Sequence, residues 1–185
     1  MHELLILNKE YIIIAHVLSV VVGMGGAIIT DVLFVYFAFN KKLSFFEIKT
    51  MRLLSKVVMC ALLFIVVTGI FVFFTNTEKY LNSAKFLTKM TVVTILSVNG
   101  VLLHFLVFRH LKDRDYLIGL KNKNLRKLAF AFGAISVVSW LTAMSLGVLD
   151  KITITYTQAI SIYLFVLSIA IMMSQIIHQY YETKK

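Results

Sequence analysis

The sequence contains no proline, one cysteine and only nine acidic residues. Without proline, no helix can be kinked or interrupted by that residue, which disfavours a transporter built from broken helices. The single Cys60 excludes an intramolecular disulfide and also covalent haem attachment through a CxxCH motif. The sequence also has no phosphate-binding loop, no GxGxxG and no His-Glu-x-x-His motif, so it carries no soluble-enzyme signature.

Long apolar runs occupy most of the chain instead. Hydrophobic residues make up 59% of it, and its mean hydropathy is +0.87. A helix needs about 20 apolar residues to cross a bilayer, and continuous rather than alternating runs indicate helices. Five runs are long enough, at residues 11–39, 52–75, 86–108, 128–149 and 155–178. We therefore predict an all-α fold: an integral membrane bundle of five transmembrane helices in the lipid bilayer, with residues 1–185 forming a single domain.

The basic residues explain the net charge of +10 without nucleic-acid binding. Most of them lie between the first and second runs, between the third and fourth, and at the C-terminus, all on one predicted side of the bundle. Cytoplasmic loops carry an excess of Lys and Arg, so we expect the N-terminus outside and the C-terminus in the cytoplasm. The predicted location is the plasma (inner) membrane of a prokaryote. The basic segment 109–127 is either an amphipathic stretch on the inner leaflet or a solvated loop.

Two of the predicted helices carry pairs of ionisable residues with matched spacing. His16 and Asp31 are fifteen residues apart, as are Lys89 and His104, which is about 22 Å along a helix. Such residues are costly in lipid and usually face the bundle interior or a functional cavity. The two helices run in the same direction, so His16 and Lys89 are predicted at similar depth near the outer face. A neutral imidazole can bind a metal or haem iron, and a desolvated lysine can act as a base or ligand. The alternatives are an interhelical hydrogen bond for His16 and snorkelling for Lys89.

A second polar group is predicted near the inner face, where Asp31, His104 and His178 fall, with Asn99 on the same helix as His104. A carboxylate near imidazoles could bind a proton, a metal ion or a quinone headgroup. The alternative is an interfacial pair that fixes the ends of the helices. Gly23 lies seven residues after His16, on the same helix face, and leaves room for either a neighbouring helix or a flat cofactor.

The first three predicted helices resemble two related membrane families. The resemblance rests on His16 followed by small residues, on a basic start and late Gly69 in the second helix, and on the Lys89-Met-Thr segment that leads to Asn99 and Gly100. One family is the membrane-embedded protoporphyrinogen oxidase family (HemJ type), and the other is the membrane domain of the copper-resistance D family. The resemblance to the oxidases implies a noncovalent haem b, with His16 and Lys89 as the required residues.

Three hypotheses follow from these patterns. The first is a haem b membrane protein that oxidises a porphyrinogen-like or other small substrate and passes electrons to a membrane acceptor such as a quinone. The second is a protein that handles copper or another metal ion, and the third is a non-catalytic membrane subunit. A homo-oligomer is compatible with each of them. Under the first two hypotheses the candidate catalytic residues are Lys89 and Asp31; the cofactor-binding candidates are His16, Lys89, Gly23 and Asn99; and the metal ligand candidates are His16, His104 and His178.

Overall fold

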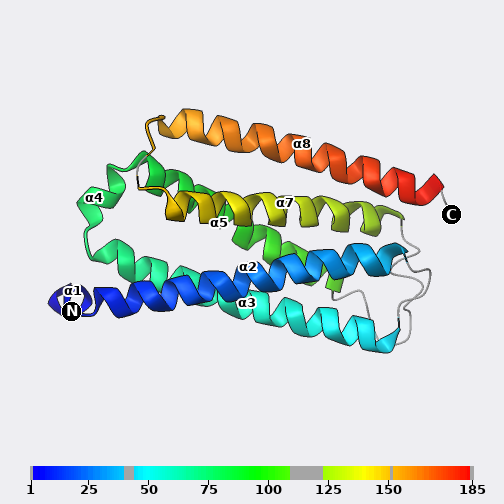
Figure 1. Cartoon of the computed structure of the whole chain (residues 1–185), viewed down its shortest axis with the longest axis horizontal. Helices are drawn as coiled ribbons and strands as arrows, with labels where there is room; N and C mark the ends of the chain where they lie inside the picture. Colours follow the sequence, from blue (N-terminus) through cyan, green and yellow to red (C-terminus); the bar gives the residue numbers. More distant parts are fainter. Residues whose placement is uncertain (1, 40–43, 109–122, 151, 184–185) are drawn as a thin grey trace.

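The computed structural model describes residues 2–39, 44–108, 123–150 and 152–183, and these are almost entirely helical. Figure 1 shows the long helices lying side by side, with the short helices α1 and α4 at one end. In chain order they are α1 (His2–Leu7), α2 (Lys9–Phe39), α3 (Phe45–Phe74), α4 (Thr77–Leu81), α5 (Ala84–Leu102), the π-helix η1 (Leu103–Phe108), α7 (Lys123–Val148) and α8 (Tyr156–Thr183).

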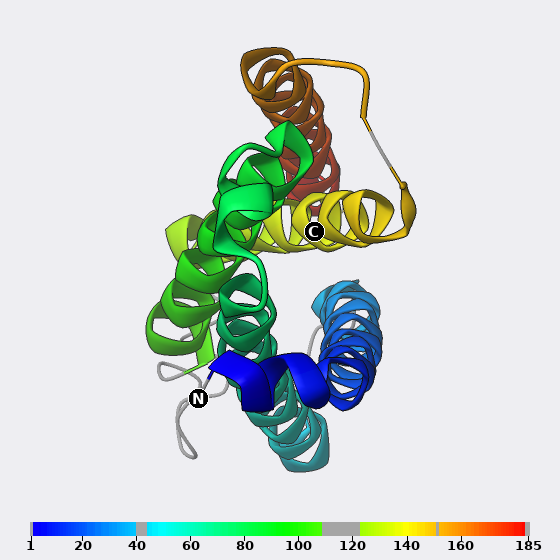
Figure 2. The same cartoon turned by 90° about the vertical axis from the view of Figure 1, so that its left-hand side faces the viewer.

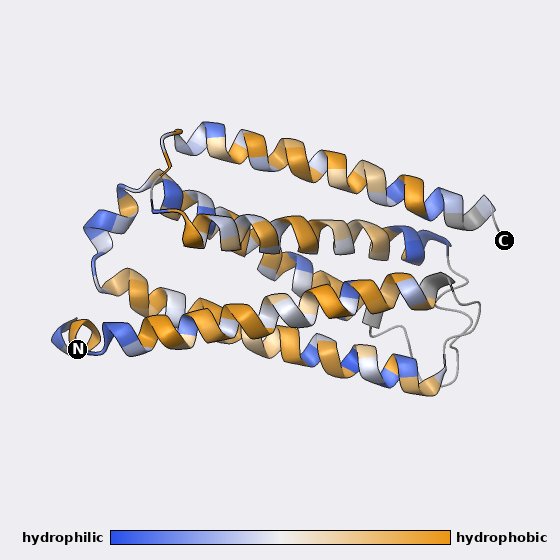
Figure 3. Cartoon of the chain, viewed as in Figure 1, coloured by the Kyte–Doolittle hydropathy of each residue, from blue (hydrophilic) through white to orange (hydrophobic). Residues whose placement is uncertain are grey.

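Five of these helices are long and apolar enough to cross a membrane, as predicted: α2, α3, α5 extended by η1, α7 and α8. Their apolar residues fill the middle of the bundle, while hydrophilic residues gather toward its ends (Figure 3). Large hydrophobic side chains such as Leu18, Leu63 and Phe165 are exposed on the outside of the bundle. In water such a surface would be unfavourable, whereas lipid is as apolar as these side chains.

Two helices begin earlier than the apolar runs predict. The predicted start of the second helix was residue 52, but α3 begins at Phe45, after Ser44. The Ser44 hydroxyl accepts a hydrogen bond from the Glu47 amide, and the Glu47 side chain accepts one from the Ser44 amide, which is a capping box. Similarly, α7 begins at Lys123 instead of residue 128, so Arg126 lies inside a helix and is buried. Of the basic segment 109–127, residues 109–122 lie outside the described part of the chain.

The third transmembrane helix is not regular to its end. The sequence predicts one helix over residues 86–108, but α5 ends at Leu102 and the chain continues as the π-helix η1. π-Helical turns are rare in proteins overall, but those that occur are often found at functional sites. His104 lies within this segment, so one of the candidate residues is presented by the irregular part of the helix.

The helices pack as a hairpin, α2 with α3, beside a group formed by α5, α7 and α8 (Figures 1 and 2). The main contact between the two parts is a core cluster around Trp140 of α7, which is 3% exposed. Ala27 of α2 and Leu62 of α3 pack in the same cluster, together with Leu96 of α5. The seam between the hairpin and the group is therefore closed by side chains from four helices.

Candidate functional site

His16, one of the polar residues predicted near the outer face, contacts α3; we call it and Lys89 the outer group. The imidazole Nδ1 of His16 lies 2.9 Å from the Thr68 hydroxyl oxygen. Thr68 donates its own hydroxyl hydrogen to the Phe64 carbonyl at 2.6 Å, so it can only accept from His16. Nδ1 therefore carries the proton, and Nε2 of a neutral His16 keeps its lone pair.

Two glycines border this outer group. A Cβ atom at Gly69 would lie 3.6 Å from the His16 Cε1 atom, and one at Gly147 would lie 3.7 Å from the Lys89 amino nitrogen. His16 of α2 therefore faces α3 through Thr68 and Gly69, and Lys89 of α5 faces α7 through Gly147. The two side chains interact electrostatically, and a direct contact between them stays a prediction.

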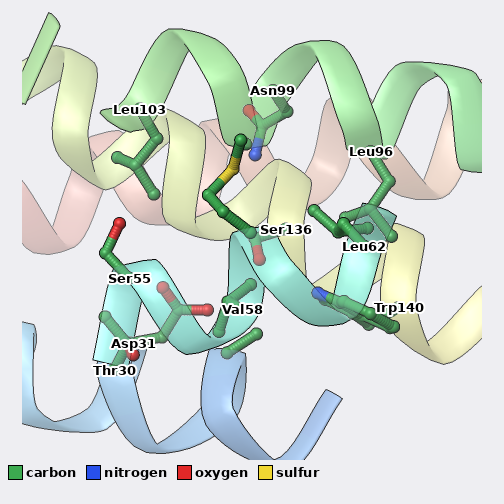
Figure 4. A pocket seen from close by; sticks show the side chains of 13 residues that line it. Thr30, Asp31, Ser55, Val58, Leu62, Leu96, Asn99, Leu103, Ser136 and Trp140 are labelled. Atoms are coloured by element: carbon green, nitrogen blue, oxygen red, sulfur yellow. The ribbon is translucent and has the colours of Figure 1, made fainter. Parts of the chain in front are cut away.

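Two of the polar residues predicted near the inner face, Asp31 and Asn99, line a small cavity at the seam between the hairpin and the other helices, which we call the inner cavity (Figure 4). Its polar lining residues are Thr30, Asp31, Ser55, Asn99 and Ser136, from α2, α3, α5 and α7. The space that water-sized molecules can occupy is about 40 Å³, room for roughly three waters at about 10–15 Å³ each.

Asp31 enters the wall of this cavity from α2. The Ser136 hydroxyl of α7 lies close enough to interact with its carboxylate, and its Oδ1 atom would lie 3.5 Å from a Cβ atom at Gly133. The other oxygen, Oδ2, is buried without a hydrogen-bond partner among the described residues. The carboxyl group is thus held against α7 but is only partly satisfied.

Asn99 occupies the α5 side of the same cavity and is 4% exposed. Its amide nitrogen donates to the Phe132 carbonyl of α7 at 3.1 Å. A carbonyl oxygen cannot donate, so this contact fixes which end of the amide is nitrogen. The amide oxygen Oδ1 is then a buried acceptor with no partner in the described part of the chain.

The two inner histidines occupy different places. The Nδ1 atom of His104 lies 3.1 Å from the Ser55 hydroxyl, which lines the cavity, so His104 adjoins the cavity through Ser55. His178 is buried on α8 with its ring 5.6 Å from that of Phe130 and is not among the residues that line the cavity. The structure therefore places Asp31 and Asn99 in one site, with His104 beside it and His178 apart.

The indole ring of Trp140 packs against α2 at Gly23. A Cβ atom at Gly23 would be only 2.6 Å from the Trp140 Cη2 atom and 3.2 Å from the Ala61 Cβ atom. The glycine lets the indole of α7 approach the backbone of α2. This matches the packing alternative for Gly23; the cofactor alternative remains a prediction.

Within the described residues, no three His, Cys, Asp or Glu side chains come together in a group that could hold a metal ion. His16, His104 and His178 are each paired with a different neighbour. A metal ion bound by protein side chains alone usually needs three or four such ligands. Haem iron needs only one or two ligands from the protein, so a haem bound through a single histidine stays a prediction.

Comparison of the chain with models of protein families, with curated proteins and with solved structures finds no match. The resemblance to the oxidase and copper-resistance families therefore remains an expectation based on the residues quoted for it.

Several residues of both sites were not predicted from the sequence. Thr68 is 52 positions from His16, and Ser136 is far from Asp31 in the chain, so spacing within one helix cannot find them. A weak signal was present, because Thr68 and Gly69 are adjacent small residues in an otherwise large apolar run. Glycines and hydroxyl side chains are the residues that let membrane helices approach and hydrogen-bond.

Proposed function

We propose that this chain is a haem b protein of the membrane with a redox function, in which His16 is an axial ligand. The observation that supports this best is the hydrogen bond from His16 Nδ1 to Thr68. Histidines that ligate metals almost always donate the other ring N–H to an acceptor, which fixes the tautomer and the ring orientation. Thr68 provides that acceptor, and Nε2 is left as the ligand atom.

Lys89 is the second residue of the proposed haem site. It interacts electrostatically with His16 from another helix, and a Cβ atom at Gly147 would lie at ordinary contact distance from its amino nitrogen. Its amine could ligate the iron, or its ammonium group could pair with a haem propionate. Either role would give Lys89 a function beyond snorkelling.

The inner cavity is too small to hold a haem, so we place the haem at the group around His16. Pockets for drug-sized ligands have volumes of about 300–1,000 Å³, whereas the space inside the cavity is about 40 Å³. His16 is half-buried on the outer part of α2 and has a glycine beside its ring. When bound there, a haem would supply one-electron transfer chemistry, while His16, Thr68 and Lys89 would bind and orient it.

The substrate, the electron acceptor and the catalytic residues are proposed from the resemblance to the oxidase family, and the orientation is proposed from the distribution of basic residues. A porphyrinogen-like substrate, a quinone as electron acceptor and a catalytic role for Lys89 and Asp31 are carried over as hypotheses, and a homo-oligomer is compatible with them. We further propose that the N-terminus is outside and the C-terminus in the cytoplasm of a prokaryotic inner membrane. In support, Lys49, Arg52 and Lys56 precede the apolar part of α3 at the proposed cytoplasmic end.

Orientation can be tested by cysteine labelling in a Cys60→Ser background. Lys79→Cys, in α4, should react with a membrane-impermeant maleimide on intact cells, and Lys49→Cys, in the first turns of α3, should react only after lysis. The reverse pattern would show that the proposed orientation is inverted.

Absorption spectra of the detergent-purified protein test the haem proposal. Protein produced with ample haem should show a Soret band, and dithionite should sharpen the α and β bands. His16→Ala should remove them, whereas His104→Ala, the matched loss of an imidazole from the inner side, should keep them. Thr68→Val should retain haem but shift its reduction potential, because the ligand loses its hydrogen-bond acceptor.

For the second residue the matched pair is Lys89→Ala and Lys85→Ala. Lys85 donates to the Leu149 carbonyl at the end of α7, so its loss should leave the haem spectrum unchanged. Lys89→Ala should alter the spectrum or the haem content. Folded wild-type protein that contains no haem despite an ample supply would contradict the proposed function.

A non-catalytic membrane subunit is the second candidate, because the His16–Thr68 contact also joins α2 to α3. In that case His16→Ala would lower stability and leave no cofactor spectrum to change. The spectra therefore separate the two candidates in a single experiment.

A further inference from the structure

We propose that the inner cavity between α2, α3, α5 and α7 is a binding site for one monovalent metal cation, of the size of sodium. This inference does not depend on the haem proposal, because the proposed haem-binding residues His16, Thr68 and Lys89 do not line this cavity. It rests on the side chains around the cavity, on their unsatisfied oxygen atoms and on their place in the bundle.

The cavity wall offers oxygen acceptors and few donors. Asp31 has a buried oxygen without a partner, and Asn99 has its amide oxygen in the same condition among the described residues. Thr30 donates its hydroxyl hydrogen to the Gly26 carbonyl at 2.7 Å, so its oxygen is left to accept. The Ser136 hydroxyl is placed to donate its hydrogen to Asp31, which leaves its oxygen to accept as well. A donor or a cation is what these oxygens lack.

Figure 4 shows how these groups are distributed around the cavity. Asp31 and Asn99 lie on opposite sides of it, on α2 and α5, and Ser136 of α7 is seen between them. Ser55 contributes a further hydroxyl oxygen from α3 and contacts His104 behind it. A cation in this space would be approached by oxygen atoms from four different helices.

The charge of the site selects a monovalent ion. A carboxylate in the interior of a membrane protein is costly unless it is paired or neutralised. One carboxylate, one amide oxygen and hydroxyl groups carry a single negative charge, which a monovalent cation balances. A divalent cation would leave a positive charge in the apolar bundle. Carboxylate, carbonyl and hydroxyl oxygens are the ligands that hard cations prefer.

A proton on Asp31 would neutralise the charge but satisfy fewer of these atoms. It supplies one donor, whereas the acceptors come from both sides of the cavity. The volume of about 40 Å³ accommodates a cation with a water molecule, but not a large organic ligand.

The chain contains its own reporter for this site. Trp140 is the only tryptophan and lines the same cavity. Tryptophan fluorescence of the purified protein can therefore be followed while NaCl replaces choline chloride at constant ionic strength. We expect a saturable change with sodium and a weaker one with potassium at the same concentration, and equilibrium binding of radiolabelled sodium should saturate at one ion per chain.

Variants connect the response to the proposed ligands. Asp31→Asn should abolish the saturable change, and Asn99→Leu should raise the half-saturating sodium concentration about tenfold or more, because one oxygen ligand to a charged group is lost. Asp150→Asn is the matched control, since Asp150 is an exposed carboxylate away from the cavity, and it should respond like the wild type.

Three results would overturn the proposal. The first is folded wild-type protein in which sodium and choline give the same fluorescence and no labelled sodium binds. The second is a sodium response that persists unchanged in Asp31→Asn. The third is an infrared carbonyl band of a protonated carboxylic acid that Asp31→Asn removes and sodium does not affect, because it would show that a proton neutralises Asp31.

Discussion

The contact between Gly23 and Trp140 allows a quantitative test of how the two parts of the bundle pack. A Cβ atom at Gly23 would lie 2.6 Å from the Trp140 ring and 3.2 Å from the Ala61 Cβ atom. Gly23→Ala must therefore displace the indole, which is 3% exposed and packed among Ala27, Leu62 and Leu96. Inserting one carbon into a well-packed core costs roughly 1–3 kcal/mol.

The same substitution also stabilises the helix itself, and a variant at the neighbouring Gly25 measures that stabilisation separately. Alanine is favoured over glycine in a helix interior by about 1 kcal/mol. Gly25 lies two residues further along α2, and a Cβ atom there would meet nothing within 4 Å. Gly25→Ala should therefore keep the helix benefit without the clash. The two variants are expected to differ in free energy of unfolding by roughly the 1–3 kcal/mol of the clash.

The assay is thermal unfolding in detergent, followed by far-ultraviolet circular dichroism because Trp140 itself is perturbed. Gly25→Ala should unfold at or above the wild-type temperature, and Gly23→Ala clearly below Gly25→Ala. Trp140→Phe, which shortens the ring, should reduce the cost of Gly23→Ala in the double variant. Equal stability of the two alanine variants would refute the close approach of α7 to α2 at this point.

Two further predictions concern helix ends and helix contacts. Ser44→Ala removes the hydroxyl that accepts from the Glu47 amide and should destabilise the start of α3 by about 1 kcal/mol. Amide hydrogen exchange in the first turn of α3 should therefore accelerate. The control is Ser168→Ala, whose hydroxyl donates to the Leu164 carbonyl of its own helix and whose loss should leave exchange in that turn unchanged. Tyr163→Phe removes the 2.8 Å hydrogen bond between Tyr163 and Ser139 that joins α8 to α7. In chemical unfolding it should lower the free energy of unfolding by about 0.6 kcal/mol, and Tyr36→Phe, at an exposed ring, should lower it less. Equal effects of the two substitutions would count against the interhelical bond.

Much of the architecture could be predicted, because the length and apolar composition of a run are enough to identify a helix that could cross a membrane. The helix ends were harder, since they depend on local chemistry that apolar runs do not show. Ser44 and Glu47 have the spacing of a capping box, so the earlier start of α3 was readable. Arg126 was not, because a charged residue next to a basic segment looks like a loop until its burial in α7 is seen.

The sites were predictable only along single helices. Counting residues along each predicted helix places His16 and Lys89 at the same depth. Which helices are neighbours, however, depends on packing between segments that are far apart in the sequence. Asp31 and Asn99 share a cavity because α7 brings Ser136 and the Phe132 carbonyl between them. Nothing in the spacing of Asp31 or Asn99 indicates those partners, and nothing local separates His178 from the same group.

The π-helical segment at the end of α5 has a consequence for how this chain can change in length. A π turn contains one residue more than an α turn covering the same span. Losing a single residue within Leu103–Phe108 would restore ordinary helical geometry and leave the preceding turns of α5 where they are. Such a deletion would turn the residues that follow it by about 100° around the helix axis, and His104 with them if the deletion precedes it. The contact between His104 and Ser55 therefore depends on the extra residue of the π turn, which the loss of one codon would remove.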